Sequence, residues 1–126
     1  MRVAVIDHGF VRVARERVYE LVSDPSGYPA WWPRVRAAGE GRIDLPVIGP
    51  VAYRTQGVHE DVGLLVPIEG PRVEGHLQWH LNEFQDGTIV HVATDVETRR
   101  RWSARRVLRH RSSIRRALLE LKTRLE

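Results

Sequence analysis

The chain has 126 residues, of which 42% are hydrophobic and 29% charged, and its formal net charge is +4 at pH 7. This length and balance are typical of a soluble globule and predict one domain over residues 1–126. The sequence has no cysteine, which excludes disulfides, a thiolate nucleophile and a cysteine zinc site. No apolar run approaches the roughly 20 residues that span a bilayer. Because Asp7 and His8 come too early for a signal-peptide core, we expect a cytoplasmic protein.

The N-terminal part predicts a strand followed by a short amphipathic helix. Residues 3–12 are expected as the strand and residues 14–23 as the helix. Pro25 disfavours helical geometry at the residue before it and Gly27 allows a reversal, so the helix has a reason to stop here. The apolar stripe of the helix, at the spacing i, i+3, i+4, consists of Val18, Leu21 and Val22.

An aromatic segment follows this stop. Tyr28, Trp31 and Trp32 lie within five residues, before Pro33 ends the segment. Together they bring a large apolar area to one corner of the molecule. That corner must be covered by the protein's own sheet or by a ligand.

The middle of the chain predicts further strands. Residues 35–41 are a plausible second strand, whereas residues 45–50 are expected to form a loop because of their prolines and glycine. Residues 51–55 alternate as a half-buried strand should. Residues 62–68 form another apolar run, in which Pro67 favours an edge strand or a bulge.

The clearest pattern is a hairpin of residues 73–85 and 88–99, with Asp86-Gly87 as its two-residue turn. Gln85 is then expected to pair with Thr88, and this register sorts apolar from polar side chains on the two faces. On the apolar face the expected pairs are Leu77 with Val96, Trp79 with Thr94, and Leu81 with Val92. On the polar face they are His76 with Glu97, Gln78 with Asp95, and Asn82 with His91.

The last segment, from about Trp102 to Leu125, predicts a long amphipathic helix of roughly 24 residues and 36 Å. Its apolar stripe needs a partner, and the apolar face of the hairpin is the obvious one. The stripe consists of Val107, Ile114, Leu118, Leu121 and Leu125, with Leu108, Ala117 and Leu119 beside them.

In this order of elements the chain resembles the START-like helix-grip superfamily, in particular its polyketide cyclase/dehydrase and lipid-transport (SRPBCC) branch. The segments that carry the resemblance are Glu16–Asp24, Tyr28–Pro33, Glu74–Trp79, Asp86–Thr88 and the C-terminal helix. It implies an α+β helix-grip fold: a curved antiparallel sheet of about six strands wrapped around the terminal helix, with two short helices after the first strand. It also implies a cavity for a hydrophobic or aromatic ligand between sheet and helix. In this chain the cavity residues would be Trp32, Tyr53, Thr55, Leu77, Trp79, Leu81, Val92 and Thr94.

Other kinds of site find little support in the sequence. It has no His-Glu-x-x-His motif, no Gly-x-Ser-x-Gly motif and no glycine-rich phosphate loop, so we expect neither a metal nor a cofactor, and catalytic residues are not assigned. The positive charge is concentrated at one end of the chain. Residues 1–98 hold nine Lys/Arg and fourteen Asp/Glu, which gives −5, whereas residues 99–126 hold eleven Lys/Arg and two Glu, which gives +9.

The leading functional hypothesis is a protein that binds a small hydrophobic, lipid-like or polyketide-like molecule. Two alternatives remain open. One is an aromatase/cyclase acting on a carrier-tethered polyketide, in which the basic helix docks an acidic carrier protein; the tyrosine that some of these enzymes carry after the aromatic segment would fall at Val35. The other is a protein-interaction module with a filled core. A nucleic-acid partner is disfavoured, because the rest of the chain is acidic and would repel phosphate, and a homodimer is left open.

Overall fold

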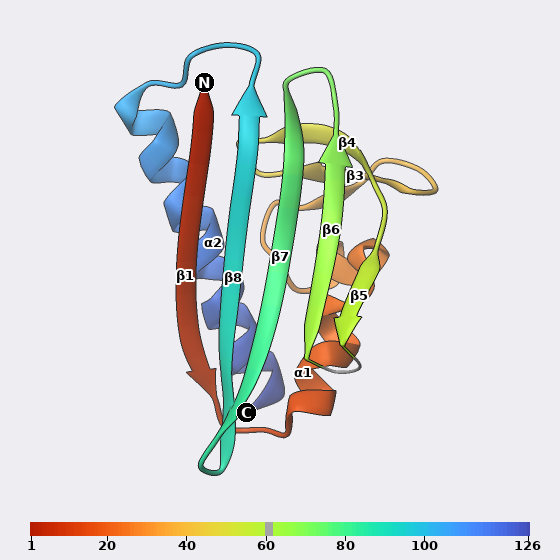
Figure 1. The fold of residues 1–126 in the computed structure, drawn as a ribbon, viewed down its shortest axis with the longest axis vertical. Coiled ribbons are helices and arrows are strands. Elements are labelled where there is room, and N and C mark those ends of the chain that lie inside the picture. The colour runs from red at the N-terminus through yellow and green to blue at the C-terminus, as the bar shows by residue number, and fades with distance from the viewer. Residues whose placement is uncertain (60–61) are drawn as a thin grey trace.

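The computed structural model describes residues 1–59 and 62–126, in which an antiparallel sheet lies across one long C-terminal helix (Figure 1). The sheet has eight strands in the order β1-β8-β7-β6-β4-β3-β2, and β5 pairs with β6 beside this path. The elements in chain order are β1 (Arg2–Val11), α1 (Arg15–Val22), η1 (Pro25–Ala30), β2 (Arg36–Ala37), β3 (Arg42–Leu45), β4 (Gly49–Tyr53), β5 (Gln56–His59), β6 (Gly63–Glu69), β7 (Val73–Phe84), β8 (Gly87–Thr98) and α2 (Ala104–Leu125). The helix-grip prediction is confirmed, with eight strands rather than six.

The two extra strands come from the middle of the chain. The expected second strand over residues 35–41 is reduced to the two residues of β2, and β3 was not predicted. The expected loop over residues 45–50 is a tight turn whose ends already belong to β3 and β4, because Leu45 pairs with Gly49. Val47 and Gly49 make this reversal with positive φ angles of 69° and 90°.

Strand β6 is an interior strand, so the edge position expected from Pro67 is wrong. On one side β6 pairs with β7, and on the other its partner changes from β5 to β4. Pro67 lies between Leu65, which pairs with Gln56, and Ile68, which pairs with Tyr53. The missing proline N–H therefore falls where the neighbouring strand is interrupted, and few ladder hydrogen bonds are lost.

The hairpin of β7 and β8 has the predicted faces but a register that differs by two residues. Its turn is Gln85-Asp86, and Gln85 has the positive φ angle, 52°. Gly87 is already in β8, where a Cβ atom would lie 2.4 Å from the backbone oxygen of Val11. The glycine thus allows β1 to approach closely rather than forming the turn. The observed pairs include Leu77 with Thr94, Trp79 with Val92, Leu81 with Val90, His76 with Asp95, Gln78 with Ala93, and Asn82 with Ile89.

Helix α2 packs its apolar stripe against the inner face of the sheet, as predicted. Ser103 caps the helix, because its hydroxyl accepts a hydrogen bond from the Arg106 backbone N–H at 3.1 Å. Leu108 and Leu119, which flank the stripe, are 62% and 49% exposed and lie outside the core. The fully buried residues of α2 are His110, Ile114, Ala117, Leu118 and Leu121.

The basic face of α2 is expected to contribute little to stability. Arg105, Arg109 and Arg116 are exposed, and among the described residues their one ion pair is a 3.8 Å contact between Arg116 and Glu120. Replacing all three with glutamine should change the free energy of unfolding by about 0.5 kcal/mol or less, as measured by urea denaturation. A loss of several kcal/mol would show that these arginines support the fold through contacts other than those described.

Candidate ligand-binding site

A groove of about 730 Å³ lies between α2 and two loops, the one that follows η1 and the β3–β4 turn. The first loop contributes Pro33 and Arg34, and the turn contributes Pro46 and Val47. Asp7 of β1 lies at its border. The residues of α2 that line it are Arg109, Arg111, Ser112, Ser113, Arg115, Arg116 and Leu119.

Both loops are attached to α2 by hydrogen bonds. Arg106 Nη2 donates to the backbone oxygen of Val47 at 3.1 Å, and Trp32 Nε1 donates to Ser113 Oγ at 3.2 Å. Trp32 is 3% exposed, so its ring lies beneath the groove while its one polar atom reaches a residue that lines it. This hydrogen bond links a residue of the groove to the aromatic core.

The core beneath the groove is a cluster of four aromatic rings: Tyr28, Trp31, Trp32 and Trp79. Their centroids lie 5.2–6.3 Å apart. The Tyr28 hydroxyl accepts from Trp79 Nε1 at 2.9 Å and donates to the backbone oxygen of Val22 at 2.5 Å. Burial raises the pKa of Tyr28 well above its ordinary value, so this hydroxyl stays protonated. The protein's own sheet and helix therefore cover the aromatic corner.

The structure brings six of the eight predicted site residues together. Trp32 lies under the groove, and the other five face the inner side of the hairpin, each at most 2% exposed: Leu77, Trp79, Leu81, Val92 and Thr94. Tyr53 and Thr55 lie elsewhere. Tyr53 is half-buried and lines a separate depression of about 500 Å³ with Arg54 and Glu69, and Thr55 is exposed between β4 and β5.

Sequence reasoning missed a buried polar pair between the sheet and α2. His110 Nε2 lies 2.7 Å from Thr94 Oγ1, and its ring meets that of Trp102 edge-on at 5.5 Å. His110 Nδ1 has no hydrogen-bond partner among the described residues. Burial lowers the pKa of His110 to about 4, so the ring is neutral at pH 7. The available signal was helical spacing, because position 110 lies between Val107 and Ile114 on the same stripe.

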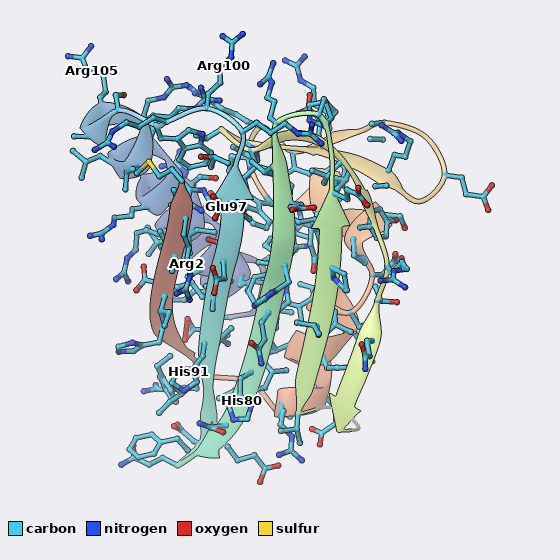
Figure 2. The ribbon with its side chains drawn as sticks, turned by 45° about the horizontal axis from the view of Figure 1, so that its top comes forward. Arg2, His80, His91, Glu97, Arg100 and Arg105 are labelled. Carbon is cyan, nitrogen blue, oxygen red and sulfur yellow. The ribbon has the colours of Figure 1, made fainter. Side chains whose placement is uncertain are left out.

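Three histidines form a row on the outer face of the sheet. His91 of β8 pairs with both His8 of β1 and His80 of β7, with ring centroids 5.8 and 5.9 Å apart; Figure 2 shows His80 and His91 side by side. Desolvation, followed by the neighbouring histidines, lowers the pKa of His91. The expected pair with Asn82 is diagonal, with Asn82 Nδ2 3.2 Å from His91 Nε2. Within residues 1–59 and 62–126 no three His, Asp or Glu side chains are placed to share a metal ion.

The comparisons with known proteins identify the fold. No family model and no curated protein matches the sequence. Among solved structures, a START superfamily protein from Mycobacterium smegmatis matches with a TM-score of 0.80 and 17% identity, covering 97% of this chain and 96% of that one. The Zhui aromatase/cyclase from a Streptomyces species matches with a TM-score of 0.77 and 17% identity, covering 99% and 94%.

No helix in the described part of the chain is long and apolar enough to cross a membrane.

A third match is the Aha1 dimer from Colwellia psychrerythraea, with a TM-score of 0.72 and 15% identity, covering 98% of this chain and 96% of that one. The three likenesses extend over almost the whole chain and over both the sheet and the terminal helix. The chain therefore has the START-like helix-grip fold.

Proposed function

We propose that the protein binds a small hydrophobic or aromatic molecule that enters between α2 and the two loops and lies against the aromatic core. The observation that carries this proposal is the groove above Trp32. Its volume of about 730 Å³ is within the usual range of small-molecule sites, roughly 300–1,000 Å³. The fold shared with a START superfamily protein and an aromatase/cyclase supports it.

Movement of Trp32 is the step that would open the interior. Its indole has one hydrogen bond, to Ser113, so turning the ring toward the groove breaks a single polar contact. The ligand would then contact the inner face of the hairpin behind the ring. The residues that we propose to line this deeper part of the site are Leu77, Trp79, Leu81, Val92 and Thr94.

The proposal predicts saturable binding of an uncharged aromatic probe. N-phenyl-1-naphthylamine should quench tryptophan emission with a micromolar dissociation constant, about −8 kcal/mol. Ser113→Phe should weaken binding by about tenfold or more, because the larger ring fills the base of the groove. Leu108→Phe is the matched control, since Leu108 is on the same helix, exposed and outside the groove. The proposal fails if the wild-type protein does not bind the probe saturably, and the filled-core interaction module would then be favoured.

An aromatase/cyclase is a second candidate function, favoured by His110. His110 has one unpartnered nitrogen among the described residues and lies between sheet and helix, where it could accept a proton from a polyketide carbon. Because burial lowers its pKa to about 4, this role requires that the bound polyketide raise the pKa of His110. The test is incubation with a poly-keto thioester, in which wild-type protein should release cyclised product and His110→Gln should not. Equal product from both proteins would contradict a role for His110.

A further inference from the structure

The groove above Trp32 is strongly basic. Five of its residues are arginines, and one is an acid, Asp7. The arginines come from both walls, because Arg34 belongs to the loop after η1 and the other four to α2. Such a gathering of like charges around one concave surface favours an anionic occupant.

Few of these arginines are neutralised within the protein. Arg115 forms an ion pair with Asp7, in which Nη2 lies 2.8 Å from Oδ1. Asp7, the one acid that lines the groove, therefore neutralises Arg115 and none of the other four arginines. Within the described part of the chain, the ion pair of Arg116 is the long 3.8 Å contact with Glu120 on α2. Among the residues that the structure describes, Arg34, Arg109 and Arg111 have neither an ion pair nor a side-chain hydrogen bond. Guanidinium groups are well suited to bind carboxylate or phosphate oxygens through paired N–H donors.

The hydroxyl groups of the groove add neutral donors. Ser113 Oγ already accepts a hydrogen bond from Trp32, so its own O–H remains available to donate. Ser112 lines the groove one residue earlier and is exposed. An oxyanion above this turn of α2 would meet both hydroxyl and guanidinium donors.

The loop that supplies Arg34 is held in an unusual conformation. Arg34 has a φ angle of +69°, in the left-handed region that residues other than glycine rarely adopt. The backbone before it is fixed, because the Trp32 N–H donates to the Tyr28 oxygen at 2.8 Å. Arg34 therefore directly follows a hydrogen-bonded turn of the buried aromatic segment.

The groove also has an apolar part. Pro33, Pro46 and Val47 form it on the loop side, and the exposed Leu119 forms it on α2. A ligand that satisfies both parts must combine an apolar body with a charged end.

We infer that the preferred ligand is an amphipathic anion, whose carboxylate or phosphate is bound by Arg34 and Arg109 in the groove while its apolar body lies toward Trp32. This inference rests on the proposed function and names the chemical class of its ligand.

The test compares ligands with one chain and different ends. Decanoate, decyl phosphate and decan-1-ol are titrated against N-phenyl-1-naphthylamine bound to the full chain. At low salt the two anions should displace the probe at concentrations about tenfold below that of the alcohol, and about 0.5 M NaCl should shrink this advantage. A stronger effect of decyl phosphate or of decanoate identifies which oxyanion the groove prefers.

Two double variants separate a specific site from general positive charge. In Arg34→Gln/Arg109→Gln the affinity ratio of decanoate to decanol should fall toward one. The matched control is Arg100→Gln/Arg105→Gln. These two arginines point outward at the top of the view in Figure 2 and do not line the groove. This control should keep the wild-type ratio.

Equal affinities of decanoate and decanol for wild-type protein, or an equal loss of the ratio in both variants, would overturn the inference and leave the proposed function standing. Failure of the probe and of all three ligands to bind would overturn both.

Discussion

Replacing Trp79 with alanine is expected to lower the free energy of unfolding by about 3–5 kcal/mol. The Trp79 ring is fully buried at the centre of the aromatic cluster, and it contacts the rings of Tyr28, Trp31 and Trp32. Alanine would leave a large cavity and would remove the donor that the Tyr28 hydroxyl accepts from. Urea denaturation, followed by circular dichroism, measures the loss.

The control for Trp79→Ala is Phe84→Ala in the same strand. Phe84 is 49% exposed, so this change removes an aromatic ring without opening the core and should cost about 1 kcal/mol or less. If Trp79→Ala and Phe84→Ala were equally mild, the aromatic cluster would not be the packing centre of the fold.

The stability of the protein is expected to fall by about 2 kcal/mol between pH 7 and pH 4.5 because of His110 alone. Burial lowers the pKa of His110 in the folded state to about 4, from 6.5 for the free side chain. Between pH 6.5 and about pH 4 the His110 side chain is therefore protonated in the unfolded chain but not in the folded protein. Acid consequently favours unfolding. This stability is fully present above pH 6.5 and is lost as the pH falls toward 4.

The measurement is the unfolding free energy of wild-type protein and of His110→Gln at pH 7 and pH 4.5. Glutamine can keep the hydrogen bond to Thr94 but does not titrate, so the variant should be less sensitive to acid by about 2 kcal/mol. Other groups titrate equally in both proteins and cancel in this comparison. The same pH dependence in both proteins would mean that His110 is accessible to water in the folded state.

Periodicity in the sequence was sufficient to predict which face of each long element is buried. The stripe of α2 and the two faces of the β7–β8 hairpin follow from helical and alternating patterns, which depend only on local geometry. The hairpin faces survived a register error of two residues, because a shift of two returns every side chain to the same face. Alternation cannot detect that error. Gly87 is needed where the backbone of Val11 in β1 approaches closely, and this contact with a strand far earlier in the chain is not visible in any local pattern.

The candidate site was only partly predictable for the same reason. The sequence indicated Trp32 and five inner residues of the hairpin, because large apolar side chains at alternating positions point to the core. The groove itself joins residues of β1, the loop after η1, the β3–β4 turn and α2, which have no common spacing in the chain. The sequence by itself determined the fold class and the buried faces, since these depend on periodicity within single elements. Only the tertiary structure decided the register, the environment of His110 and the gathering of arginines over Trp32, because each depends on contacts between segments far apart in the chain.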